Sequence, residues 1–249
     1  MKQKINPLIA VVGETASGKT SLGIEIAKKH NGEIITADSR SVYRGLDIGT
    51  AKPTVEEQGQ VTHHLLDIVN PDQKFNVGDF QRLAYRAIAD IESRNKLAIM
   101  VGGTGLYIDS VLFDYQFSNQ NKQSDADRQT MRENCLVIGL KLSRNQLRSR
   151  IEKRVEAMFK AGLRKEVDEL VEKYGWGNEA MTGIGYREFK PFYDGEISMS
   201  KVKRDIAQNT LSTLAKHQRT WFKRNPKIKW FECPADALEC VADFLSRQK

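Results

Sequence analysis

Residues 13–20 read Gly13-Glu14-Thr15-Ala16-Ser17-Gly18-Lys19-Thr20, which fits the phosphate-loop pattern G-x-x-x-x-G-K-[ST]. The apolar run 8–12 before it predicts a buried parallel strand, and the helical pattern after it ends at Asn31-Gly32. Backbone N–H groups of such a loop converge on a phosphate chain, and the helix N-terminus adds partial positive charge. We expect Lys19 to reach the terminal phosphates and Thr20 to place its hydroxyl on Mg²⁺. The stretch therefore predicts a strand–loop–helix unit that binds a di- or triphosphate, as in ATP-binding and other nucleotide-binding proteins.

The rest of the chain continues the alternation of strands and helices that is typical of a doubly wound α/β sheet. We expect strands over 33–37, 64–69, 97–101, 136–140 and 229–231, and helices over 80–92, 143–174, about 200–224 and 235–245. The stretch 114–133 is polar and predicts a loop or a short excursion. The fold class is therefore α/β, a P-loop NTPase-like parallel sheet core with flanking helices.

Composition narrows the class of protein. The chain has 249 residues and three widely spaced cysteines, which fit neither a disulfide framework nor a two-pair zinc site. No apolar run is long enough to span a bilayer, and nothing near the first residues fits a cleaved signal. We expect a reduced, cytoplasmic protein with no membrane partner.

The positive charge is concentrated in one stretch. Residues 201–229 hold nine Lys and Arg against the single acid Asp205, a net charge of +8 in a chain whose total is +7. Such a block indicates a polyanion larger than one nucleotide, with phosphates contacted by Lys216, Arg219 and Lys223. The alternative is a solvated helix face, the common fate of charge runs.

The candidate catalytic residues follow predicted strands. In open parallel sheets ligands bind beyond the carboxyl ends of the strands, where Asp38 and Thr104 fall. The strand 97–101 ends in Gly-Gly-Thr, not in the acid that holds magnesium in a generic NTPase. Asp38 is either a general base or a water-mediated magnesium holder, and we favour the base. Thr104 is either a hydroxyl donor or part of a structural turn, while Arg150 or Arg154 could clamp a leaving diphosphate or belong to a solvated helix face.

Several motifs together resemble the tRNA dimethylallyltransferase (tRNA isopentenyltransferase) family. They are GETASGKT from Gly13, ADSRSVYRGLDIGTAKP from Ala37, HHLLDI from His63, VGGTGLY from Val101, VIGLKLSRNQLRSRIEKRVEAMFKAGLRKEV from Val137, GIGYREF from Gly183 and AKHQRTWF from Ala215. The resemblance spans residues 13–222, and its most specific segment is the one that begins at Ala37.

This resemblance implies transfer of a dimethylallyl group from dimethylallyl diphosphate to the N6 amine of adenosine 37 in tRNA, beside the anticodon, with release of diphosphate. The loop would hold the prenyl diphosphate with Mg²⁺ instead of hydrolysing ATP. By position, Asp38 resembles the base, and Thr104 and Arg154 the groups that stabilise the leaving pyrophosphate. The tRNA side would comprise Asp38, Ser39, Arg40, Ser41, Gly183, Ile184, Gly185, Tyr186 and Arg187. The implied partners are the tRNA anticodon stem-loop and dimethylallyl diphosphate, and we expect a monomer.

Two departures from the family pattern matter. Glu14 replaces the usual proline of the loop, and only residues 114–133 stand where a helical tRNA-binding insert is usual. The core is thus expected over 1–113 and 134–249, with 114–133 as a shortened insert. The alternatives are an adenylate dimethylallyltransferase acting on free nucleotides, a P-loop small-molecule kinase, and a catalytically weak RNA-binding remnant.

Overall fold

A parallel six-stranded sheet runs through residues 6–117 and 130–248, the part of the chain that the computed structural model describes. The strand order is β3-β2-β4-β1-β5-β6, and every pairing is parallel. The strands are β1 Leu8–Gly13, β2 Gly32–Thr36, β3 His63–His64, β4 Leu97–Val101, β5 Cys135–Leu140 and β6 Lys229–Phe231. This sheet confirms the predicted α/β fold class.

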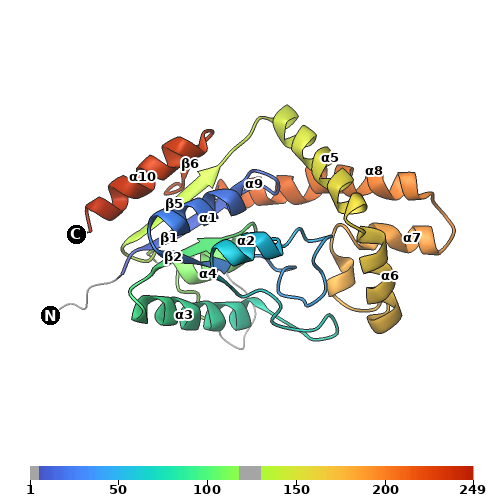
Figure 1. The fold of residues 1–249 in the computed structure, drawn as a ribbon, viewed down its shortest axis with the longest axis horizontal. Helices are drawn as coiled ribbons and strands as arrows, with labels where there is room; N and C mark the ends of the chain where they lie inside the picture. Colours follow the sequence, from blue (N-terminus) through green and yellow to red (C-terminus); the bar gives the residue numbers. More distant parts are fainter. Residues whose placement is uncertain (1–5, 118–129, 249) are drawn as a thin grey trace.

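Helices cover both faces of the sheet. The side chains of β1 alternate between two apolar clusters, one on each face. Leu8, Ala10 and Val12 belong to one apolar cluster, and Ile9 and Val11 to the other, because successive strand residues point to opposite faces. The Ile9 face is covered by α1 (Lys19–Lys29) and α10 (Pro234–Ser246), with α2 (Val55–Gln60) beside α1. The Leu8 face is covered by α3 (Val77–Ser93), α4 (Gly105–Leu112) and α9 (Lys216–Phe222) (Figure 1).

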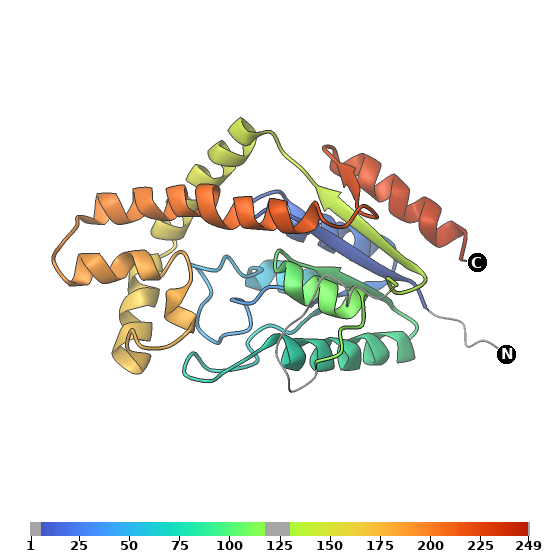
Figure 2. The ribbon, with the colours of Figure 1, turned by 180° about the vertical axis from the view of Figure 1, so that it is seen from behind.

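A second group of helices extends past the carboxyl edge of the sheet (Figures 1 and 2). It consists of α5 (Arg144–Lys160), α6 (Leu163–Tyr174), α7 (Lys190–Tyr193) and α8 (Met199–Asn209). Buried residues of α5, such as Ile151 and Val155, pack in the same cluster as Ile206 of α8. The site therefore lies between the sheet edge and this helical group.

Three sequence predictions about these elements are wrong in detail. The single helix 143–174 is two helices, because Gly162 adopts a left-handed φ of 99° between α5 and α6. The helix 200–224 continues from α8 into α9, but Thr210–Ala215 between them is wound as a π-helix. The strand 64–69 is only the two-residue β3, since Leu65 and Asp67 have positive φ and turn the backbone away from the sheet.

Within residues 6–117 and 130–248, no helix combines the length and the apolar character that crossing a bilayer would require.

Candidate active site

A cavity of about 450 Å³ lies at the carboxyl edge of the sheet. Its wall is made by the phosphate loop, the segments after β2 and β4, helix α5, and the helix from α8 to α9. Lys19, Asp38, Thr104 and Arg154 all line it. These four side chains, predicted separately from the sequence, are thus brought together in one cavity.

The phosphate loop has the backbone conformation that its glycines allow. Gly13 has φ 139°, and a Cβ there would lie 2.6 Å from the carbonyl oxygen of Leu140. Gly18 has φ 103° and precedes the first turn of α1. Side chains are disfavoured at both positions, so the loop can approach an anion through its backbone.

Lys19 is one of the residues that line this cavity. Its Nζ donates to the carbonyl oxygen of Glu14 at 2.6 Å, folding the side chain back over the loop. Burial first and repulsion by Arg154 second lower the pKa of the Lys19 ammonium to about 8, against the raising effect of Asp38 and Glu14. An anion on the loop would favour the charged form of this lysine.

Two arginines of α5 donate hydrogen bonds to the phosphate loop. Arg154 donates from Nη1 to Thr15 Oγ1 and from Nη2 to the Thr50 carbonyl, both at 3.1 Å. Arg150 donates from Nη1 to the Ser17 carbonyl at 3.0 Å. Burial lowers the pKa of the Arg154 guanidinium while Asp38 raises it, and the group stays cationic. Both side chains therefore contact the phosphate loop, Arg154 from a partly buried position and Arg150 from an exposed one.

Asp38 follows strand β2, and one of its two carboxylate oxygens accepts hydrogen bonds from the backbone. Its Oδ1 accepts from the backbone N–H of Arg40 at 2.8 Å and of Ser41 at 3.2 Å. Oδ2 has no hydrogen bond with any described residue. Thr104 fixes the next residue, because its Oγ1 accepts from the Ser39 N–H at 2.9 Å. The carboxylate is thus held in one orientation with an oxygen left to accept a proton.

The segment that follows Asp38 is anchored by groups far away in the sequence. Buried Lys52 donates to the carboxylates of Asp47 at 2.7 Å and Asp67 at 2.6 Å. Glu166 of α6 accepts backbone N–H groups of Asp47, Ile48 and Gly49, at 2.7 to 3.0 Å. Sequence reasoning missed Glu166, whose only signal was its place in the motif that begins at Val137.

The residues expected on the tRNA side are only partly accessible. Arg40, Gly183, Ile184 and Arg187 line the cavity, with Ser39 and Ser41 beside Asp38. Tyr186 is buried and donates to Glu166 Oε1 at 2.7 Å. Gly185 packs against the carbonyl of Gly49. In this structure the Tyr186 side chain is buried and supports the segment 47–49 through Glu166, and contact of residues 183–187 with tRNA stays a prediction.

Helix α9 contributes contacts that the sequence did not reveal. Gln218 Oε1 accepts the Thr15 N–H at 2.7 Å, and Arg219 pairs with Glu14, Nε to Oε1, at 2.9 Å. This pair engages Nε and Nη2 of Arg219, whose side chain is 41% exposed, and the predicted contact of Arg219 with tRNA stays a prediction. Elsewhere in the basic block, Lys201 pairs with Asp205 and Lys203 with Glu156, which reduces the free positive charge.

Comparison with known proteins identifies the family of the chain. The IPP transferase family model matches residues 41–133 and 115–225. The chain belongs to the IPP transferase family. A tRNA dimethylallyltransferase of Macrococcus caseolyticus is 36% identical over 95% of this chain and 94% of its own length. Another, from Geotalea daltonii, is 39% identical over 92% of this chain and 88% of its own.

Solved structures agree in fold. A tRNA isopentenylpyrophosphate transferase from Bacillus halodurans superposes with a TM-score of 0.89 at 30% identity, covering 98% of both chains. One from Staphylococcus epidermidis gives 0.87 at 33% identity, covering 98% of this chain and all of its own. The alignment with the Macrococcus relative spans 294 positions, more than the 249 residues of this chain, so that relative carries residues absent here. The two stretches matched by the family model overlap at 115–133, where the sequence predicts a shortened insert.

Proposed function

We propose that this chain transfers the dimethylallyl group of dimethylallyl diphosphate to the N6 amine of adenosine 37 in tRNA. The observation that carries the proposal is the composition of the cavity wall. Asp38 is the one carboxylate among the described lining residues, and it faces the cations of Lys19 and Arg154. A single base beside an anion-binding loop suits transfer from a diphosphate to an amine.

Different residues of the cavity would bind the diphosphate, accept the proton and exclude water. The loop, Lys19 and Arg154 hold the diphosphate, whose charge grows as the bond between its oxygen and the prenyl C1 breaks. The N6 nitrogen forms the new bond to C1, and Asp38 Oδ2 accepts the proton that the amine loses. The apolar side chains of Ile151, Val155 and Met158 line the same cavity and could exclude water from the reacting carbon. Atoms balance, since the products are the prenylated amine, diphosphate and one proton.

A magnesium ion fits this donor set. Thr20 lines the cavity at the start of α1, where its hydroxyl would join diphosphate oxygens and water, the hard oxygen ligands that Mg²⁺ prefers. The ion would neutralise charge on the leaving diphosphate. The described residues contain no cluster of three or more His, Cys, Asp or Glu for an ion held by protein alone.

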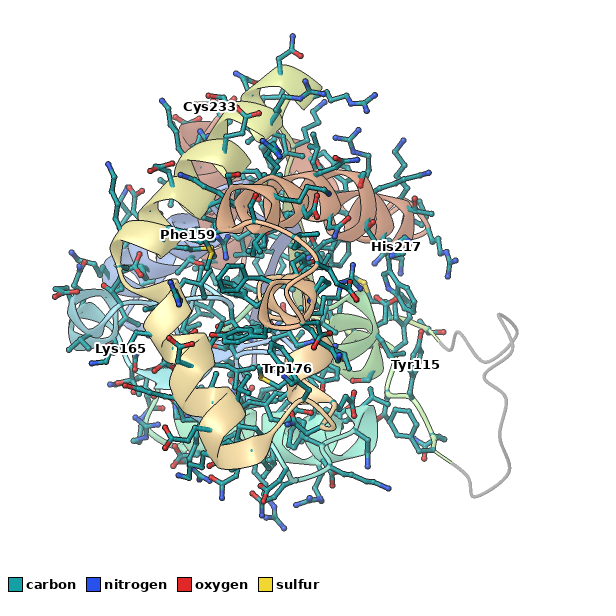
Figure 3. All side chains as sticks on the ribbon, turned by 90° about the vertical axis from the view of Figure 1, so that its right-hand side faces the viewer. Tyr115, Phe159, Lys165, Trp176, His217 and Cys233 are labelled. Carbon is teal, nitrogen blue, oxygen red and sulfur yellow. The ribbon has the colours of Figure 1, made fainter. Side chains whose placement is uncertain are left out.

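The acceptor side of the proposal depends on α9. His217 of α9 lines the cavity, and Figure 3 shows it on the same side of the molecule as Tyr115, within the proposed shortened insert 114–133. Lys216 and Lys223 of this helix have exposed side chains and take part in no ion pair with described residues. We infer that they contact the backbone of the anticodon stem-loop, on the side where the shortened insert 114–133 is expected.

Incubation with labelled dimethylallyl diphosphate and either bulk tRNA or AMP tests the proposal. We expect label in tRNA and little in AMP. Faster labelling of AMP at equal concentration would favour an adenylate dimethylallyltransferase. Absence of transfer from this donor to either acceptor would refute prenyl transfer and leave a kinase or an RNA-binding protein.

A further inference from the structure

An acidic residue inside an anion-binding loop needs an explanation. Glu14 is the second residue of the phosphate loop, and its side chain is only 6% exposed. A buried carboxylate beside bound phosphates would repel them unless a cation compensates it. The compensating group comes from a helix 205 residues further along the chain.

Arg219 provides that compensation with a two-point contact. Its Nε donates to Glu14 Oε1 at 2.9 Å and its Nη2 to Oε2 at 3.0 Å. Bidentate arginine–carboxylate pairs fix geometry as well as charge. The preceding residue of α9 fixes the loop backbone, because Gln218 accepts the Thr15 N–H in a buried hydrogen bond. Two successive loop residues are thus held by two successive residues of α9.

The Glu14–Arg219 ion pair is also connected to Lys19, the cation that would bind the diphosphate. The Glu14 carbonyl accepts from Lys19 Nζ, so the pair and Lys19 act on the same residue. Gln218 lines the cavity, and its amide lies against the backbone of the turn that leads to Thr104. Loss of the Glu14–Arg219 ion pair should therefore alter the position of Lys19 and of the cavity wall where the donor would bind.

We propose that Arg219 is a positioning residue that sets the affinity for the prenyl diphosphate by neutralising Glu14 and holding the phosphate loop. This inference rests on the proposed function and adds to it a role for a residue that the sequence assigned to tRNA. It also accounts for the departure at Glu14, because the acid is tolerated when Arg219 stands opposite. Removal of Arg219 alone should leave an uncompensated negative charge, whereas removal of both charges should not.

The experiment compares Arg219→Gln, Glu14→Gln and the double variant with Arg82→Gln, an exposed arginine of α3 that pairs with Asp79. Dissociation constants of dimethylallyl diphosphate and of inorganic pyrophosphate with Mg²⁺ are measured by calorimetry, with KM, kcat and melting temperature. We expect Arg219→Gln to raise the donor Kd and KM by about 10- to 100-fold, with kcat at saturation within about threefold of wild type. The double variant should recover binding to within about threefold, and Arg82→Gln should match wild type.

Two results would overturn the inference: donor binding by Arg219→Gln like that of wild type, or a double variant as weak as Arg219→Gln. If Arg219→Gln does not fold, Glu14→Gln carries the test, because it should bind the donor at least as tightly as wild type, and tenfold weaker binding would contradict the role. Failure of the proposed function is distinguishable. In that case wild type transfers no prenyl group, while the pyrophosphate titrations still report on the pair.

Discussion

The lowered pKa of Lys19 makes donor binding dependent on pH in the alkaline range. The free protein holds this ammonium with a pKa of about 8, through burial first and repulsion by Arg154 second. A bound diphosphate favours the charged form, so binding above pH 8 must include uptake of a proton. With that pKa, about nine-tenths of the molecules carry the charge at pH 7 and about one-tenth at pH 9. The apparent Kd of dimethylallyl diphosphate should therefore rise about tenfold between pH 7 and pH 9.

The assay is a donor titration without tRNA, repeated in buffers of different protonation enthalpy so that proton uptake is measured directly. Arg at position 19 stays charged throughout, so Lys19→Arg is the matched control, and its Kd should change little over the same range. A wild-type Kd that is constant from pH 7 to pH 9, or one that changes equally in the variant, would refute this reasoning about Lys19.

Three further predictions test other parts of the structure. Asp38→Asn should lower turnover by about 10²–10⁴-fold with donor Kd nearly unchanged, measured by single-turnover transfer, and near-normal turnover would remove Asp38 as the base. The pair Lys216→Gln and Lys223→Gln should weaken tRNA binding and reduce the slope of log K against log salt by about 2, and an unchanged slope would mean that α9 does not contact phosphates. Glu33 is buried against Arg94, which holds the pKa of its carboxyl at about 2, so it stabilises the fold above pH 4.5 and this contribution is lost as pH falls through 2. Glu33→Gln should therefore cost about 3 kcal/mol at pH 7 in urea unfolding and progressively less below pH 4.5, and a cost that does not depend on pH would exclude this ion pair as the cause.

The sequence was sufficient for the parts of the site that follow from local pattern. The glycines and Lys19 define the loop within eight residues, and an apolar run before it and a helical run after it place it in a parallel sheet. Asp38 and Thr104 could be assigned to the same edge because carboxyl ends of parallel strands meet there. Their proximity needed no knowledge of the tertiary contacts.

Contacts between distant helices could not be predicted in this way. Glu166 and Arg219 lie on amphipathic helices where charged residues normally face solvent, and nothing in the periodicity separates them from their exposed neighbours. Their partners are more than 100 residues away, so only the packing of α6 against the segment 47–49 and of α9 against the phosphate loop reveals them. The break at Gly162 had a local signal, the glycine itself, which the helical spacing of buried positions on both sides of it concealed.

Nucleoside analysis of a reacted anticodon stem-loop tests the central claim most directly. A stem-loop with adenosine at position 37 is incubated with dimethylallyl diphosphate, Mg²⁺ and either wild type or Asp38→Asn, then digested and separated with mass detection. We predict N6-dimethylallyladenosine from wild type, formed in equal amount with diphosphate, its loss when adenosine 37 is replaced by guanosine, and a rate lower by about 10²-fold or more for Asp38→Asn. An unmodified stem-loop alongside prenylated AMP in a parallel reaction, or modification at an adenosine other than 37, would contradict it.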